Sequence, residues 1–273
     1  MLSPDRLADL DAFLIGLNAV SAKVILPLFR ADHGLDDKNV GGAFDPVTAA
    51  DKGAEAALRV AITNRFPEHG VIGEEYGADR PDADFVWVID PIDGTRAFIA
   101  GLPLWTTLIG LRFHGVPVLG SIGQPFLDEV FIGHAEGSRL VRQGAVSPLA
   151  VRDKVPLRDA IIATTDPHAC FKPAERAAWA PLRDAARLVR LGCDAYAYAM
   201  VAAGKLDLVV EAGLKSWDVE AAVPLIAGAG GIITDWSGAP IGREGGQIAI
   251  AGGRGVLDEA LAYLRPAALK TDG

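Results

Sequence analysis

The sequence predicts an α/β protein whose two halves pack together as one unit. Short apolar runs that end in acidic residues predict buried strands at 71–73 and 85–89. After residue 150, apolar runs alternate with segments of helical periodicity. The chain has 273 residues, close to the length of about 250 to 300 residues at which a single hydrophobic core stops growing. We therefore divide it into an N-terminal half, residues 1–148, and a C-terminal half, residues 149–273.

Two helices and an antiparallel sheet are expected in the first half. Apolar residues recur at helical spacing near the N-terminus and predict a helix over residues 3–30 rather than a signal peptide. A second helix is predicted over residues 51–65 and ends before Phe66-Pro67. The glycine-rich loop 31–44 between them is either a mobile cover of a site or a surface connector. Further antiparallel strands, joined by glycine and proline turns, are predicted at 106–113, 116–122 and 129–133.

The second half is predicted to alternate between strands and helices. The predicted strands are 160–164, 206–211, 231–234 and 248–251. The predicted helices are 173–187, 194–203 and 219–228. Ligands of α/β sheets gather at the carboxyl ends of strands, so acidic residues at those ends are candidate site residues.

Charge and cysteine content exclude several classes of protein. The chain carries 26 Lys plus Arg against 35 Asp plus Glu, and this negative balance without a basic cluster argues against nucleic-acid binding. No uninterrupted apolar stretch reaches the roughly 18 residues that suggest a membrane span. Cys170 and Cys193 have neither the number of a disulfide scaffold nor the spacing of a zinc site, which favours a reducing cytoplasm. The histidines show no ligand spacing, and we expect them at surface or turn positions.

An acidic turn, Asp90-Pro91-Ile92-Asp93-Gly94-Thr95, follows the predicted strand 85–89. Proline stiffens the turn, so that two carboxylates can converge with a backbone carbonyl between them, an arrangement that suits Mg²⁺. Gly94 and Thr95 begin a short helix, whose free N–H groups favour a phosphate. The same pattern is also compatible with a plain structural turn, in which Gly94 supplies a positive φ and Thr95 caps the helix.

Two further acidic segments stand at predicted element boundaries. Gly73-Glu74-Glu75 follows the strand 71–73, and Asp218 precedes the helix 219–228. A carboxylate such as that of Glu74 can accept the proton of a water held by the Thr95 hydroxyl in line with phosphorus. Solvation is the alternative for Glu75, and helix capping is the alternative for Asp218. Together with the acidic turn, these residues predict a metal-assisted phosphate site.

Five segments of the chain resemble the inositol monophosphatase superfamily of Mg²⁺-dependent phosphatases, and they occur in the order typical of that family. The segments are Asp45-Pro46-Val47-Thr48-Ala49-Ala50-Asp51, Gly73-Glu74-Glu75, Trp87-Val88-Ile89-Asp90-Pro91-Ile92-Asp93-Gly94-Thr95, Trp217-Asp218 and Gly228-Ala229-Gly230-Gly231. They extend the resemblance over about residues 5–265. The resemblance implies a layered αβαβα sandwich, a homodimer, and an active site between the two halves of each chain.

The resemblance also implies roles for individual residues. The implied metal ligands are Glu74, Asp90, the Ile92 carbonyl, Asp93 and Asp218. Glu74 and Thr95 match the positions that orient and activate water, Asp51 matches a supporting position, and Gly94 and Thr95 match the phosphate-binding amides. Two or three Mg²⁺ ions per site are expected. Ala50 departs from the pattern, since relatives often carry a polar or acidic residue there, and this weakens the case for a third ion.

The choice of phosphate monoester should be made in the second half. Asp194 and Glu211 occupy substrate-recognition positions of the family, together with Asp218, and two carboxylates suit a cationic amine or imidazole. L-histidinol phosphate carries both groups beside its ester. The amino-acid sequence at Leu191–Tyr196 and Leu208–Glu211 is also more similar to the histidinol-phosphatase branch of the family than to the inositol branch. For Asp194, an exposed position at the start of a helix is the alternative.

Three other functions are kept as alternatives. An inositol-1-monophosphatase would use Glu211 as a hydroxyl acceptor and would have no need of Asp194. A nucleotide or sugar phosphatase would need a basic cluster for a second phosphate, which the sequence lacks. A catalytically silent scaffold, recruited for instance to an RNA-associated assembly, is disfavoured by the intact acidic set and the negative net charge.

Overall fold

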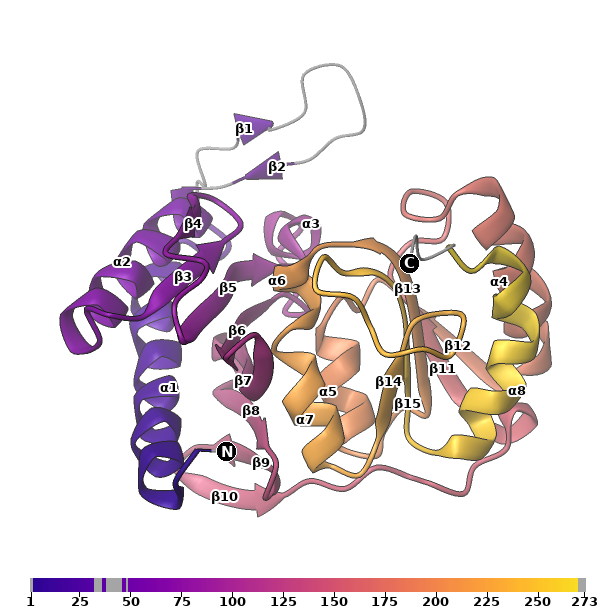
Figure 1. Ribbon diagram of the computed structural model, residues 1–273. Helices are drawn as coiled ribbons and strands as arrows, with labels where there is room; N and C mark the ends of the chain where they lie inside the picture. The colour runs from indigo at the N-terminus through magenta and orange to yellow at the C-terminus, as the bar shows by residue number, and fades with distance from the viewer. Residues whose placement is uncertain (1, 32–35, 38–45, 48, 270–273) are drawn as a thin grey trace.

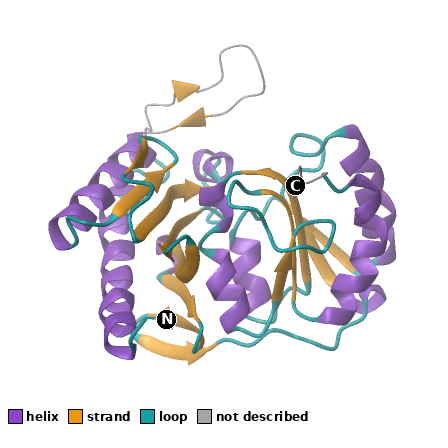
Figure 2. Ribbon diagram, viewed as in Figure 1, coloured by secondary structure: helices purple, strands orange, loops and turns teal. Residues whose placement is uncertain are grey.

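The computed structural model describes residues 2–31, 36–37, 46–47 and 49–269. Helices and sheets alternate in five layers across the molecule, from α1 (Pro4–Ile25) and α2 (Ala49–Arg65) to α4 (Pro173–Ala185) and α8 (Arg254–Leu264), as Figure 1 shows. The layers run helix, sheet, helix, sheet, helix (Figure 2). The predicted αβαβα sandwich is therefore confirmed.

The first sheet lies against α1 and α2. Its strands are β3 (Gly70–Gly73), β4 (Gly77–Asp79), β5 (Phe85–Asp93), β6 (Thr106–Phe113), β7 (Val116–Gln124), β8 (Glu129–His134), β9 (Gly137–Arg142) and β10 (Ala145–Pro148). They lie in the order β10-β9-β8-β7-β6-β5-β3-β4. All neighbours are antiparallel except β3 and β5, which are parallel and bring Gly73 beside Ile89. The ends of these two strands therefore deliver Glu74 and Asp90 to the same edge.

The second sheet is built from the later part of the chain. Its strands are β11 (Ile161–Thr164), β12 (Leu188–Leu191), β13 (Leu208–Leu214), β14 (Ile232–Thr234) and β15 (Gly246–Ala251), in the order β12-β11-β13-β15-β14. The strand β11 is parallel to β12 and β13, whereas β15 is antiparallel to both of its neighbours. The helices α4 and α8 pack on its outer face around the buried rings of Trp179 and Trp236.

The middle layer joins the two sheets. It consists of α5 (Tyr196–Ala202) and α7 (Ala222–Gly228), preceded by the short helix α6 (Ser216–Val219). The helix α7 packs on β7 and β8 of the first sheet, and α5 packs on β13 of the second. Small residues allow this close approach. A side chain on Gly120 or Gly133 would meet the backbone of the middle layer at 2.2 Å.

Sequence signals explain the helix α1. The Ser3 hydroxyl accepts a hydrogen bond from the Arg6 amide, and Pro4 occupies the first helical position, where its missing N–H costs nothing. Leu10, Leu14 and Leu17 are fully buried against the sheet. Burial of each leucine contributes about 1.5 to 3 kcal/mol.

The observed elements differ from the predicted ones in several places. The first helix ends at Ile25 rather than near residue 30, and the predicted helix 219–228 is divided into α6 and α7. The strands β4, β10 and β12, which are short, largely exposed and at sheet edges, were not predicted from the sequence, and neither were β9 and α8. The predicted loop 31–44 lies almost entirely outside the described residues, apart from residue 31 and the two-residue strand β1 (Asp36–Asp37), which pairs with β2 (Pro46–Val47).

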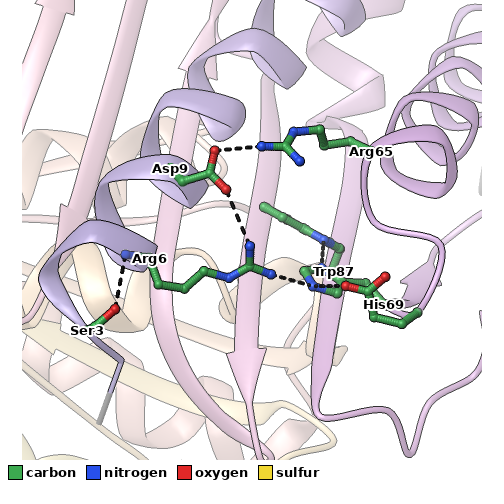
Figure 3. Close-up of polar contacts among 7 residues, drawn as sticks. Ser3, Arg6, Asp9, Arg65, His69 and Trp87 are labelled. Carbon is green, nitrogen blue, oxygen red and sulfur yellow. Dashed lines mark hydrogen bonds and ion pairs between the residues drawn. The ribbon is translucent and has the colours of Figure 1, made fainter.

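The expectation that every histidine lies at the surface or in a turn is wrong for His69, whose side chain is buried. Its ring is buried and stacks between Phe66 and Phe85, with centroids 4.4 Å and 4.7 Å away. The Trp87 indole N–H donates to Nδ1 of His69 at 3.0 Å, and an Arg6 guanidinium nitrogen lies 3.3 Å from Nε2 (Figure 3). The His69 side chain thus links α1 to the first sheet, which is a structural role.

Among the described residues, no helix is both long enough and apolar enough to cross a bilayer.

Candidate active site

The acidic turn forms the end of β5, where the pairing with β6 becomes irregular between Asp90 and Asp93. The Asp90 carboxylate accepts the Ile92 amide at 3.0 Å, and the Thr95 hydroxyl donates to the Ile92 carbonyl at 3.1 Å. The Thr107 hydroxyl, from β6, donates to the Pro91 carbonyl at 2.8 Å. These bonds fix the backbone of the turn, including the Ile92 carbonyl.

Three carboxylates converge above this turn. Asp90, Asp93 and Asp218 each place one oxygen so that the three oxygens lie within 4.8 Å of one another. Asp218 comes from α6, far along the chain, and the Lys215 amide donates to its Oδ2 atom at 2.7 Å. The Ala195 amide donates to Asp93 at 2.7 Å and so ties the start of the middle layer to the turn.

Burial and mutual repulsion penalise the charged forms of these groups. The pKa of Asp90 lies well above its ordinary value because of burial and then because of the negative charge of Glu74. Burial followed by the charge of Asp194 raises the pKa of Asp93 in the same way. Burial raises the pKa of Asp218 to about 7. Oxygen donors that repel one another in this way fit a hard cation such as Mg²⁺, which would compensate their charges.

Glu74 and Asp51 border the same cluster. Glu74 follows β3, and its backbone amide donates to the Ile89 carbonyl of β5 at 3.3 Å. Its charge acts on both Asp90 and Asp218. Asp51 is buried in the first turn of α2, and its charge also acts on Asp90. The predicted set from the first half is therefore gathered at one edge of the first sheet.

Gly94 and Thr95 open the short helix α3 (Thr95–Ile99). Gly94 has φ of 81°, a left-handed conformation that glycine adopts without strain. Both residues line a cavity of about 270 Å³, which also contains Asp93 and Asp218. Gly94 and Thr95 begin the helix and also line the cavity. Their structural role in the turn is therefore compatible with the predicted role in binding phosphate.

Asp194 and Glu211 line this cavity from the second half. Asp194 does not begin a helix as predicted. It has φ of 45° and precedes α5 by two residues, and this left-handed turn carries its carboxylate against Gly94. A Cβ on Gly94 would lie 3.0 Å from the Asp194 Oδ2 atom. Burial raises the pKa of Asp194 to about 6, although the charge of Arg96 opposes this shift.

Glu211 is buried at the bulged end of β13. Its carboxylate accepts the Thr165 amide at 2.7 Å, the Thr165 hydroxyl at 2.9 Å and the Thr164 hydroxyl at 3.2 Å. Burial raises its pKa to about 8 despite these donors. Three of about four acceptor positions are thus filled, and the carboxylate is held in one orientation toward the cavity.

Several residues that line the cavity were not predicted from the sequence, among them Arg96, Thr165 and Tyr198. Arg96 directly follows the acidic turn, and Thr165 directly follows the predicted strand 160–164, so their positions in the chain were usable signals. Tyr198 is buried at the cavity wall, whereas the Tyr196 hydroxyl donates to Glu129 at 2.8 Å.

A buried ion pair anchors the segment that carries Asp218. Two guanidinium nitrogens of Arg112, on β6, donate to the two carboxylate oxygens of Glu220, each at 2.7 Å. Both side chains are about nine-tenths buried, with exposures of 10% and 7%. This bidentate contact joins α6 to the first sheet two residues beyond Asp218.

Comparison with known proteins agrees with this geometry. The chain is 43% identical over 256 residues to the bifunctional phosphatase IMPL2, chloroplastic, of Arabidopsis thaliana, covering 91% of this chain and 72% of the relative. It is 35% identical to the histidinol-phosphatase of Chlorobaculum parvum, over 71% of this chain and 73% of the relative. Among solved structures, an inositol monophosphatase from Zymomonas mobilis superposes with a TM-score of 0.83 at 38% identity, covering 94% and 98% of the two chains.

The family model described as "Inositol monophosphatase family" matches residues 6–269, nearly the whole chain. The match includes both sheets and both walls of the cavity. The chain therefore belongs to the inositol monophosphatase family and is a phosphatase of that family.

Proposed function

We propose that the protein is a Mg²⁺-dependent phosphomonoesterase that hydrolyses L-histidinol phosphate to L-histidinol and phosphate, a step of histidine biosynthesis. The observation that carries this proposal is the pair of carboxylates, Asp194 and Glu211, that share one cavity with the acidic cluster. The division of labour follows the two halves, since residues 1–148 supply most ligands for metal and phosphate and residues 149–273 select the organic group.

The acidic cluster supplies the donors for the metal. Glu74, Asp90, the Ile92 carbonyl, Asp93 and Asp218 would hold Mg²⁺, with Asp51 as a support. When bound, Mg²⁺ neutralises phosphate charge and lowers the pKa of water.

The protein's own groups perform the remaining tasks. Thr95 orients the attacking water through its hydroxyl, and Glu74 accepts the proton as the new P–O bond forms. The amides of Gly94 and Thr95 bind phosphate oxygens, whose charge grows along the reaction. The bond to the alcohol oxygen breaks, and this oxygen receives a proton as L-histidinol leaves.

Recognition of the organic group follows from charge. In the ligand-free protein, burial disfavours the ionised forms of Asp194 and Glu211 and raises both pKa values. An ammonium or imidazolium beside them would favour the ionised forms, and each charge-assisted hydrogen bond would contribute about 1.5 to 3 kcal/mol. An inositol ring offers neutral hydroxyls and gains less from two carboxylates.

The relatives support both this substrate and its main alternative. The Chlorobaculum parvum protein carries the name histidinol-phosphatase, whereas the Zymomonas mobilis structure is of an inositol monophosphatase. Inositol-1-monophosphatase activity is therefore our second candidate. A nucleotide or sugar phosphatase ranks below it.

Steady-state assays on L-histidinol phosphate and inositol 1-phosphate decide between the two candidates. We expect a higher kcat/KM for histidinol phosphate, and an equal or lower value would refute the proposal. Asp194→Asn should raise KM for histidinol phosphate about 10-fold to about 150-fold, as loss of one charge-assisted bond implies. The same variant should leave hydrolysis of an aryl phosphate almost unchanged, which is the control.

The non-enzymatic alternative has its own test. Asp93→Asn removes a carboxylate from the acidic cluster and should abolish Mg²⁺-dependent turnover on every phosphate ester. If the biological role of the protein survives this change in the cell, the scaffold function is supported and the catalytic one is not.

Three further parts of the proposal concern the working enzyme. We expect a homodimer, two or three Mg²⁺ ions per site and a location in the cytoplasm. Light scattering of the purified protein measures the first, calorimetric titration with Mg²⁺ the second, and cell fractionation the third.

A further inference from the structure

Glu55 is a fully buried carboxylate that the proposed chemistry does not use. It lies on α2, on the face that packs against the first sheet, and it sits directly beneath the turn that carries Glu74. A carboxylate that loses all contact with water is costly unless charged or polar partners surround it. Its partners therefore indicate what it does.

Within the described part of the chain, the donors to Glu55 belong either to that turn or to Arg59 on α2. Its Oε2 atom accepts the backbone amide of Glu75 at 2.7 Å, and its Oε1 atom accepts the backbone amide of Tyr76 at 3.1 Å. Arg59, one helical turn further on, donates from Nε to Oε1 at 2.8 Å. The same guanidinium also donates to the Gly77 carbonyl. The Glu55–Arg59 ion pair thus forms hydrogen bonds with both N–H and C=O groups of one turn.

The absence of a side chain on Gly73 leaves space for the Glu55 carboxylate. A Cβ at this position would lie 2.1 Å from Oε1 of Glu55 and 2.4 Å from its carboxyl carbon. The glycine has no positive φ, so its backbone conformation alone does not require glycine. The carboxylate occupies the space that any other residue would fill.

Glu74 is consequently fixed from both sides. Its own amide donates to Ile89 of β5, and the amides of the next two residues donate to Glu55. The first contact ties the turn to the strand that ends in Asp90, and the second ties it to a helix of 17 residues. A displacement of about 1 Å in a reacting group can cost about 100-fold in rate.

We infer that Glu55 is a positioning residue, which acts through the turn at 73–77 to hold Glu74 in place for the metal and for the attacking water. This inference rests on the proposed function, because it gives Glu74 both tasks. Glu55 itself touches neither substrate nor metal, and its partner Arg59 keeps it oriented.

The test replaces Glu55 by glutamine. The amide has the same shape but turns an NH₂ group toward one of the backbone donors, so the turn loses a hydrogen bond and gains a repulsive contact. Loss of such an outer partner typically costs about 10- to 100-fold in activity or metal affinity. We expect a fall of that size in kcat for an aryl phosphate, with KM nearly unchanged. Calorimetry without substrate should show a larger dissociation constant for Mg²⁺, which means weaker binding.

Glu175→Gln is the matched control. Glu175 is also a buried helical carboxylate, 3% exposed, and it accepts the Lys172 amide at 2.6 Å and the Gln247 side-chain amide at 2.7 Å. It lies on α4, in the outer layer of the second sheet. This variant should lose thermal stability while kcat and the Mg²⁺ dissociation constant stay at wild-type values.

Gly73→Ala keeps the inference testable if Glu55→Gln fails to fold, because it presses on the same carboxylate from the other side. It should reproduce the loss of kcat and of Mg²⁺ affinity. If wild type binds Mg²⁺ and cleaves phosphate esters while the Glu55 and Gly73 variants behave like Glu175→Gln, the inference is overturned and the proposed function stands. If wild type neither binds Mg²⁺ nor cleaves any phosphate ester, both are overturned.

Discussion

Replacing His69 by glutamine should flatten the loss of stability that the fold suffers between pH 7 and pH 5. The His69 ring is 1% exposed and stacks between two phenylalanines. Burial, helped by the charges of Arg6 and Arg80 and opposed by Glu68, lowers its pKa from 6.5 to about 4. The folded state therefore requires the neutral imidazole.

The sign and size of the effect follow from the two pKa values. A histidine whose pKa is depressed on folding contributes stability above pH 6.5, and this contribution is lost as the pH falls toward 4. Between pH 7 and pH 5 the free energy of unfolding should fall by about 2 kcal/mol from this group alone, and the full loss below pH 4 should reach about 3 kcal/mol.

Urea unfolding followed by tryptophan fluorescence measures the effect, since Trp87 contacts the ring. The difference between wild type and His69→Gln cancels the contributions of the other titrating groups and should change by about 2 kcal/mol over this pH range. His168→Gln is the control, because its residue lies in an exposed turn. A difference between wild type and the His69 variant that stays constant from pH 7 to pH 5 would refute the reasoning.

Two further predictions concern the site. Arg112→Met strands the buried Glu220 carboxylate and should lower the free energy of unfolding by about 3 to 5 kcal/mol, whereas Arg112→Met combined with Glu220→Leu should lose much less. A double-mutant cycle in urea measures this, and additive losses would contradict the pairing. Burial raises the pKa of Asp218 from 3.8 to about 7, so its stabilising contribution is fully present below pH 3.8 and is lost as the pH rises from there through about 7. A fixed Mg²⁺ concentration of 100 times the dissociation constant at pH 8 should restore about 2.7 kcal/mol at pH 8. The same concentration should restore less at pH 5, where protonated carboxyl groups bind the ion more weakly. Thermal unfolding with chelator or Mg²⁺ measures this, and an equal Mg²⁺ effect at both pH values would count against it.

The sequence by itself determined the acidic turn and the class of protein. The spacing within Asp90–Thr95 is local, and a proline, a glycine and a threonine dictate its backbone through short-range sterics and hydrogen bonds. The buried strand before the turn, β5, was also predicted from its uninterrupted apolar run at 85–89. The five ordered segments then predicted the family, which the comparison confirmed.

The resemblance implied that Asp218 and Asp194 belong to the site, but only the tertiary structure showed how these distant groups meet at that turn. Asp218 joins Asp90 and Asp93 because α6 is anchored to the first sheet, and Asp194 reaches Gly94 because it adopts a left-handed conformation before α5. The predicted helix 194–203 had begun at Asp194, whereas α5 begins at Tyr196. The contact of Glu55 with the turn at 73–77 was likewise invisible in the sequence, since nothing local links a helical glutamate to a glycine on a strand. Local sterics fix a turn, whereas contacts between halves depend on how the middle helices pack between two sheets.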